Sequence, residues 1–301
     1  MKILILGANG QVGWELQRAC AVLGECVAWN RHHCDLEHIE TLEQKVLREA
    51  PDVLINAAAY TAVDKAESDK EAAFILNRDV PGILARCMRQ VGGWLIHYST
   101  DYVFDGKKKT PYLESDTPNP LSVYGETKLA GELAIASSSC QYIILRTSWV
   151  YGLHGSNFPK TMLGLAQSRD QLSVVNDQFG APTSAELIAD VTAHVVRTIM
   201  DEKSGEETYS GVYHLVAGGK TSWHELASNI IERARNRGLP IKVAAGNVNA
   251  IPGSDYPVAA ERPINSCLSN EKLQSMFSLS LPHWKDHVER FVREYVERGM
   301  Q

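Results

Sequence analysis

Short, largely apolar segments alternate with amphipathic ones through the first half of the chain, and this alternation limits the folds open to it more than any other feature. The apolar segments predict strands at Lys2–Leu6, Cys26–Trp29, Asp52–Asn56, Trp94–Ser99 and Tyr142–Thr147. The segments between them predict helices at Gln11–Leu23, Thr41–Glu49, Glu71–Val91 and Ser122–Ser137. Apolar strands of this kind need cover on both faces, so the sequence predicts an α/β fold with a doubly wound parallel (Rossmann-like) sheet. Ligands of such sheets bind beyond the carboxyl ends of the strands.

The alternation becomes less regular after Trp149. Helices are predicted at Asn157–Gln167, Ala185–Met200, Trp223–Arg237 and Lys285–Glu297, with proline or paired glycines in the loops between them. We expect residues 1–150 to form a dinucleotide-binding domain to which later segments return. Residues 151–301 are expected to form mainly a smaller C-terminal substrate-binding lobe.

Composition excludes several classes of function. A formal net charge of −6 argues against a nucleic-acid-binding protein, which needs a basic surface. No apolar run reaches the roughly 18 residues of a membrane helix, and the first strand follows Met1 and Lys2 without a signal peptide. The six cysteines include no Cys-x-x-Cys pair, which favours reduced thiols over disulfides or a zinc site. We therefore expect a cytoplasmic protein that binds neither nucleic acid nor membrane.

A glycine-rich turn follows the first predicted strand and opens the first predicted helix. Gly7, Gly10 and Gly13 flank Gln11 and Val12 in a Gly-x-x-Gly-x-x-Gly pattern. Glycines at such a turn let backbone amides approach the pyrophosphate of a dinucleotide at the helix N-terminus. The alternative is a glycine turn without a ligand, and the strand–turn–helix context favours the dinucleotide site.

The segment after the second strand bears on which dinucleotide is bound. Asn30 stands where an acidic residue would read the ribose 2′-hydroxyl of NADH, and Arg31 is suited to the 2′-phosphate of NADPH. We therefore predict NADPH, with NADH as an alternative. The competing interpretation is a solvated loop. Asp35 and Leu36 follow in a loop expected to close on the adenine.

A tyrosine and a lysine one helical turn apart indicate the chemistry. Tyr124 and Lys128 are spaced by four, which places their Cβ atoms about 5–6 Å apart on one helix face. An ammonium group beside a phenol lowers the phenol pKa, so the pair is predicted to relay a proton. The spacing also occurs by chance on ordinary helices. Thr100, at the end of the fourth strand, supplies a hydroxyl that can donate to a substrate carbonyl oxygen, and the three residues together predict carbonyl reduction.

Longer stretches give a resemblance to a known family. The chain resembles the extended short-chain dehydrogenase/reductase superfamily and, more closely, the dTDP-4-dehydrorhamnose reductase family over nearly its whole length. The stretches that carry this resemblance are GQVGWEL at 10–16, TAVDKAE at 61–67, YSTDYVF at 98–104, VYGETKLAGE at 123–132, RTSWVY at 146–151 and NDQFGAPT at 176–183.

The resemblance implies hydride transfer to the 4-keto group of dTDP-4-dehydro-6-deoxy-L-mannose, giving dTDP-L-rhamnose for cell-surface polysaccharide. It implies that Tyr124 donates the proton, that Lys128 binds the nicotinamide ribose and that Thr100 polarises the ketone. Asp101 and Trp149 would then line the substrate site. The cofactor positions it implies are the glycine loop, Asp35, Leu36, Ala59, Tyr60, Thr61, Tyr98, Tyr124 and Lys128.

The residue after Asp101 distinguishes a reductase from the related dehydratases. Sugar-nucleotide dehydratases of the superfamily carry a glutamate base at that position, where this chain has Tyr102, so elimination of water is not expected. Another nucleotide-sugar reductase or an epimerase remains an alternative, as does a non-catalytic regulatory module of the same fold.

Two further sets of charged residues have less certain meanings. The resemblance places Glu15, Glu186 and Glu294 where some relatives gather glutamates around Mg²⁺ at a homodimer interface. Surface charge is the alternative, and a homodimer is left open. Arg262 offers a guanidinium suited to substrate phosphate, and Lys107–Lys109 either meet a diphosphate or form a solvated turn.

Overall fold

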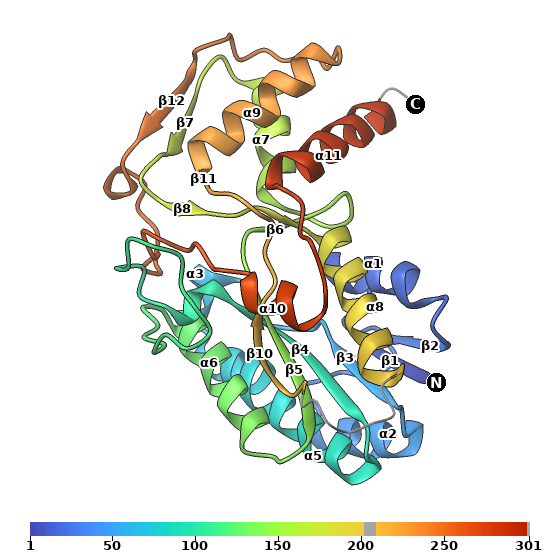
Figure 1. The fold of residues 1–301 in the computed structure, drawn as a ribbon. Coiled ribbons are helices and arrows are strands. Elements are labelled where there is room, and N and C mark those ends of the chain that lie inside the picture. The colour runs from blue at the N-terminus through green and yellow to red at the C-terminus, as the bar shows by residue number, and fades with distance from the viewer. Residues whose placement is uncertain (202–208, 300–301) are drawn as a thin grey trace.

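A parallel β-sheet forms the centre of the molecule in the computed structural model, which describes residues 1–201 and 209–299 (Figure 1). Its strand order is β10-β5-β4-β3-β1-β2, and each neighbouring pair is parallel. The strands are β1 (Lys2–Leu6), β2 (Glu25–Trp29), β3 (Val53–Asn56), β4 (Trp94–Thr100), β5 (Gln141–Thr147) and β10 (Gly211–His214). The predicted doubly wound α/β fold is confirmed.

Helices cover both faces of this sheet, as apolar strands require. Successive residues of β1 point to opposite faces, so Ile3 and Ile5 join a core with α1 (Gln11–Cys20) and α8 (Ala185–Asp201). Leu4 and Leu6 join a core on the other face with α2 (Ile39–Glu49) and α5 (Val80–Val91). Figure 1 shows α1 and α8 side by side, with α2, α5 and α6 (Val123–Ala136) across the sheet.

The helix predicted at Glu71–Val91 is one continuous rod with an irregularity in its middle. It begins as α4 (Lys70–Phe74), widens to a π-helix at Ile75–Asp79 and continues as α5. Pro81 explains the widening, because its ring lacks an N–H and clashes with the carbonyl of Asn77 four residues earlier. That carbonyl turns toward Gly131 of α6, where a Cβ would lie 2.0 Å from the Asn77 oxygen. A glycine at 131 therefore gives this carbonyl the space it needs.

The chain beyond Trp149 contributes to two regions. Helix α7 (Phe158–Ser168), α9 (Trp223–Asn236) and the parallel pair β7 (Leu172–Val175) and β12 (Val248–Ile251) lie together at the top of Figure 1. Strand β10 and helix α8 instead pack into the central sheet region. Short paired strands connect the two regions: β6 (Val150–Tyr151) with β9 (Thr183–Ser184), and β8 (Phe179–Gly180) with β11 (Thr221–Ser222).

Most predicted elements are found with ends that differ by one to three residues. The elements that were not predicted include β10, α10 (Glu271–Met276), the short helix α3 (Val63–Ala66) and the short strands β6, β7, β8, β9, β11 and β12. Helix α11 (Trp284–Gly299) packs its apolar face, including Trp284 and Phe291, on the α1–α8 side of the molecule. Within the described residues, none of the helices has the length and apolar character needed to span a bilayer.

Candidate active site

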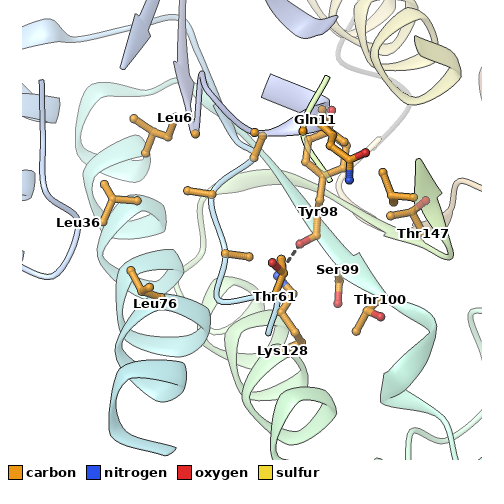
Figure 2. Close-up of a pocket in the computed structure, with 18 of the residues that line it drawn as sticks. Leu6, Gln11, Leu36, Thr61, Leu76, Tyr98, Ser99, Thr100, Lys128 and Thr147 are labelled. Carbon is orange, nitrogen blue, oxygen red and sulfur yellow. Dashed lines mark hydrogen bonds between the residues drawn. The ribbon is translucent and has the colours of Figure 1, made fainter. Parts of the chain in front are cut away.

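A cavity of about 710 Å³ opens at the carboxyl ends of β1 to β5. Figure 2 shows Gln11 at one end of it and Thr61 and Lys128 at the other, with Thr147 next to Thr100 across β4 and β5. Most of the predicted site residues line this one cavity. They are Gly7, Gly10, Gln11, Val12, Asn30, Arg31, Asp35, Leu36, Ala59, Thr61, Tyr98, Thr100, Asp101, Tyr124, Lys128 and Trp149.

The glycine turn is packed too tightly for side chains. Gly7 has a φ of +80°, and a Cβ there would lie 2.8 Å from the backbone of Ala57 and Ala58. A Cβ on Gly13 would lie 2.1 Å from the Gly7 oxygen. Gly13 therefore allows α1 to pack closely against the turn, and it does not line the cavity. The N-terminus of α1 therefore faces an open cradle, which fits the phosphates of a dinucleotide.

The end of β2 presents a cation to this cavity. Asn30 uses its side-chain oxygen to accept from the backbone N–H of His32 at 3.0 Å and to contact His33 Nδ1 at 2.8 Å. Its oxygen therefore orders the turn. Arg31 lines the cavity, is exposed, and has no ion-pair partner within residues 1–201 and 209–299. This arrangement leaves the guanidinium available to an anionic ligand.

Of the three residues predicted to bind the cofactor in the segment after β3, two line the cavity and one does not. Ala59 and Thr61 line the cavity. Tyr60 does not, because its hydroxyl donates to Asp69 at 3.0 Å and its backbone exchanges hydrogen bonds with the Asn77 side chain. Tyr60 therefore fixes the loop that presents its two neighbours.

Thr100 and Tyr124 meet at the inner end of the cavity. Burial raises the pKa of the Tyr124 phenol, and a hydrogen bond with Thr100 lowers it only in part. The prediction that Lys128 depresses the Tyr124 pKa is wrong for this structure, because Lys128 points elsewhere. Its Nζ donates to the Tyr98 carbonyl oxygen at 2.6 Å, drawn in Figure 2, and lies 3.1 Å from His97 Nε2. Tyr124 is therefore held as a neutral phenol that can donate a proton.

Two buried ionisable groups complete this end of the site. Burial lowers the pKa of Lys128 to about 8. Burial also raises the pKa of Asp101 to about 6, and Thr100 donates to the Asp101 carboxylate at 2.9 Å. Both groups therefore titrate close to neutral pH, which is typical of catalytic sites.

Trp149 lies at the boundary with the second region in a strained backbone conformation. Its φ of +47° falls in the left-handed region, which residues other than glycine rarely adopt. Its ring stacks on Trp223 with centroids 3.5 Å apart, and a Cβ on Gly180 would lie 2.6 Å from it. The stack and the close glycine hold the indole in place.

Arg262 belongs to an adjoining cavity of about 480 Å³. Its guanidinium donates to the Tyr102 hydroxyl at 2.9 Å and pairs with Asp64 at 2.7 Å. Lys107–Lys109 and Lys220 line the same cavity. Because Tyr102 lines the main cavity, this basic cavity adjoins the candidate active site.

The three glutamates assigned to magnesium carry their own counter-ions. Arg290 pairs with Glu186 at 3.1 Å and with Glu294 at 2.9 Å, and Arg18 pairs with Glu15 at 3.2 Å. Nearby Glu294 and Glu15 raise the pKa of Glu186 less than its burial does. No cluster able to hold a metal ion occurs in the described parts of the chain. Within one chain the residues therefore do not fit a magnesium site, and that prediction is not supported.

Several residues of the site were missed from the sequence. Asn56 and His97 are opposite each other in the register of β3 and β4. Asn56 is a polar residue at the end of an apolar strand, and His97 is a polar residue within one, which was a signal that could have identified them. Glu132 and Arg146 form a buried pair behind Lys128. Trp223 stacks on Trp149 from a distant segment, and nothing local in the sequence indicates that contact.

Comparison with known proteins places this geometry in a family. The family model described as "RmlD substrate binding domain" matches residues 1–297. A dTDP-4-dehydrorhamnose reductase from Shigella flexneri is 50% identical over 98% of both chains.

Two solved structures agree with this. A dTDP-4-dehydrorhamnose reductase from Clostridium acetobutylicum has a TM-score of 0.86 and 36% identity, covering 98% of this chain and 99% of its own. One from Bacillus anthracis, solved in complex with NADP, has a TM-score of 0.86 and 33% identity, covering 97% and 99%. With its sequence and fold matched along nearly their whole length, this chain belongs to the dTDP-4-dehydrorhamnose reductase family.

Proposed function

We propose that this protein is a reductase that uses NADPH to convert the 4-keto group of dTDP-4-dehydro-6-deoxy-L-mannose to the hydroxyl of dTDP-L-rhamnose. The observation that carries the proposal is the neutral Tyr124 phenol beside Thr100 at the inner end of a cavity whose outer part is a dinucleotide cradle. The names of the relatives, and the NADP in the Bacillus anthracis structure, support the substrate and the cofactor.

The chain's own residues account for the proton side of the reaction. Bound NADPH would supply hydride to the ketone carbon. The Thr100 and Tyr124 hydroxyls lie together where the ketone oxygen would sit. Tyr124 can donate to this oxygen as negative charge develops, and Thr100 can do so when its hydroxyl turns from the Asp101 carboxylate, to which it donates in this structure. Tyr124 then gives up its proton to the ketone oxygen, while Lys128 Nζ contacts the Tyr98 carbonyl oxygen and His97.

Arg31 supports the choice of NADPH over NADH. Arg31 lines the cavity without a counter-ion among the described residues, and no acidic side chain at position 30 repels a 2′-phosphate. Paired with a phosphate, Arg31 would form the bidentate contact that arginine favours. We assign Asp35 and Leu36 to the adenine side of the cofactor.

The sugar nucleotide is assigned to the boundary between the two regions. We propose that Asp101 and Trp149 contact the sugar, and that Arg262 with its neighbouring lysines faces the diphosphate. Residues 1–150, with the returning β10 and α8, would then hold the dinucleotide. Residues 151–301 would mainly form the substrate-binding lobe. The reaction is proposed to take place in the cytoplasm.

A homodimer that shares Mg²⁺ through Glu15, Glu186 and Glu294 stays a prediction. The arginine pairs within one chain weaken it, since they already balance the carboxylate charge. Sedimentation with and without EDTA tests it. A dimer that dissociates on chelation supports the metal, and a dimer or monomer unchanged by EDTA contradicts it.

The direct test of the function is an assay with the purified protein, NADPH and the 4-keto sugar nucleotide. We expect NADPH to be consumed in proportion to the dTDP-L-rhamnose formed. An epimerase would change the sugar without consuming NADPH, and a regulatory module would change neither. Either of those results would contradict the proposal.

A further inference from the structure

A buried row of three polar side chains lies behind the candidate active site. Asn56 ends β3, and His97 lies opposite it in the register of β4. Both are 1% exposed, and Lys128 of α6 is 2% exposed. Asn56 Nδ2 lies 3.1 Å from His97 Nδ1, and Lys128 Nζ lies 3.1 Å from His97 Nε2. Each nitrogen of the imidazole therefore has one partner.

The Asn56 amide determines which nitrogen of His97 carries the proton. The Asn56 side-chain oxygen accepts from the Ala58 backbone N–H at 3.2 Å, so its NH₂ group faces His97 Nδ1. Burial is the main cause that lowers the pKa of His97 well below its usual value, and the charge of Lys128 adds to it when Lys128 is protonated, so the imidazole stays neutral. A neutral imidazole has one N–H and one acceptor. Since Nδ1 accepts from Asn56, the N–H is on Nε2 and points at Lys128.

An N–H aimed at Lys128 Nζ needs a lone pair there, which only the neutral amine has. The amine can still donate to the Tyr98 carbonyl oxygen at 2.6 Å. A Lys128 ammonium would donate to His97 Nε2 instead. The single imidazole proton would then be on Nδ1, where it faces the Asn56 NH₂ group. Two hydrogen-bond donors would then face each other until the Asn56 amide turned and presented its oxygen to Nδ1.

The charged groups around Lys128 do not impose the ammonium form. On α6 the Glu132 carboxylate raises the pKa of Lys128, but Arg146 of β5 binds both of its oxygens, at 2.9 and 2.6 Å. In the elements packed on α6, Arg78 and Asp79 pair with each other, and Glu67 accepts from the Val123 backbone N–H. Asp101 of the adjoining 3₁₀ turn and Tyr124 hydrogen-bond to Thr100.

We propose that His97, oriented by Asn56, is a positioning residue that presents an Nε2–H to the Lys128 amine. Uptake of one solvent proton converts Lys128 to the ammonium, while the imidazole stays neutral and its proton changes from Nε2 to Nδ1. The protonation of Lys128 is thereby coupled to the tautomer of His97 and to the orientation of the Asn56 amide. The importance of this coupling for turnover rests on the proposed function, whereas the coupling itself does not.

The test is nuclear magnetic resonance of the full chain without cofactor. The ¹³Cε signal of Lys128, assigned with Lys128→Arg, reports its protonation, and the ¹⁵N signals of the His97 ring report which nitrogen carries the proton. We expect the two titrations to share one midpoint, with Nε2–H above it and Nδ1–H below it. Ring signals that do not change across the Lys128 titration would overturn the proposal, as would a His97 that becomes doubly protonated at that midpoint.

Variants separate the coupling from simple packing. Asn56→Ala removes the group that fixes the tautomer, so the Lys128 midpoint should rise by about one unit, the scale expected for one buried hydrogen bond to a charged group. His97→Gln, which can donate or accept, should raise it similarly. His194→Gln is the control, because His194 contacts the distant Phe277 carbonyl. An unchanged midpoint in both Asn56→Ala and His97→Gln would overturn the proposal, independently of whether the protein reduces the ketosugar.

Discussion

Arg146 and Glu132 form a two-point ion pair, with nitrogen–oxygen distances of 2.9 and 2.6 Å, inside the protein. Their side chains are 4% and 5% exposed. The pair joins β5 to α6, the helix that carries Tyr124 and Lys128. It therefore holds the catalytic helix against the sheet and neutralises the charge of the buried Glu132 carboxylate.

Breaking this pair from one side should be costly. Arg146→Met leaves the Glu132 carboxylate buried without a partner, so we expect the free energy of unfolding to fall by about 3–5 kcal/mol. Denaturant unfolding at neutral pH measures this. The double variant Arg146→Met/Glu132→Leu removes both charges and should recover much of the loss. A single variant as stable as the wild type would contradict the account.

Thr100 should matter to turnover through its hydroxyl. Thr100→Val removes a donor to the ketone oxygen, and we expect kcat to fall about 10²–10³-fold. Thr100→Ser keeps the hydroxyl and serves as the matched control, with kcat close to the wild-type value. Steady-state consumption of NADPH measures both variants. Equal activity in Thr100→Val and Thr100→Ser would remove Thr100 from the proposed mechanism.

Arg31 should discriminate between the two dinucleotides. Arg31→Ala removes a charge-assisted contact to the 2′-phosphate, so KM for NADPH should rise about 10- to 100-fold. KM for NADH should change little, because NADH lacks that phosphate. Arg48→Ala, a cation on α2 outside the cavity, is the control. An unchanged ratio of the two KM values would show that Arg31 does not read the phosphate.

The pH dependence of stability should carry the signature of Lys128. Its pKa is lowered from 10.5 to about 8 by burial, so the folded state binds this proton less tightly than the unfolded state does. The contribution of Lys128 to stability is therefore complete above pH 10.5 and is lost as the pH falls through about 8. The full difference is about 3 kcal/mol.

Lys128→Met isolates this contribution. Groups distant from position 128 titrate equally in both proteins, and burial keeps His97 neutral over this pH range. The difference in unfolding free energy between wild type and variant should therefore change by about 3 kcal/mol between pH 10.5 and 7.5. Chemical unfolding without cofactor at several pH values measures it. A difference that stays constant with pH would mean that Lys128 titrates normally.

The sequence predicted the parts of the fold that depend on local pattern. The alternation of apolar strands and helices identified the sheet, and Gly7 and Gly13 indicated a turn that tolerates no side chain. The family resemblance and the positions of the strand ends together predicted that Thr100, Tyr124 and Lys128 lie in one site, and all three line one cavity.

What the sequence did not predict depends on contacts between distant residues. The spacing of Tyr124 and Lys128 suggested a coupled pair, but the direction of the Lys128 side chain is decided by the Tyr98 carbonyl and His97 on β4. The stack of Trp149 on Trp223 joins segments more than 70 residues apart. Burial, which raises rather than lowers the Tyr124 pKa, is likewise a property of the folded molecule.

The central claim is that the Tyr124 phenol supplies the proton for reduction, and a single-turnover measurement tests it most directly. Tyr124→Phe and the control Tyr142→Phe, a tyrosine of β5 outside the cavity, are each loaded with NADPH and mixed with the 4-keto sugar nucleotide. We predict that Tyr124→Phe still binds NADPH but oxidises it about 10²–10⁴ times more slowly than the wild type, while Tyr142→Phe retains the wild-type rate. Oxidation by Tyr124→Phe at the wild-type rate would contradict the mechanism.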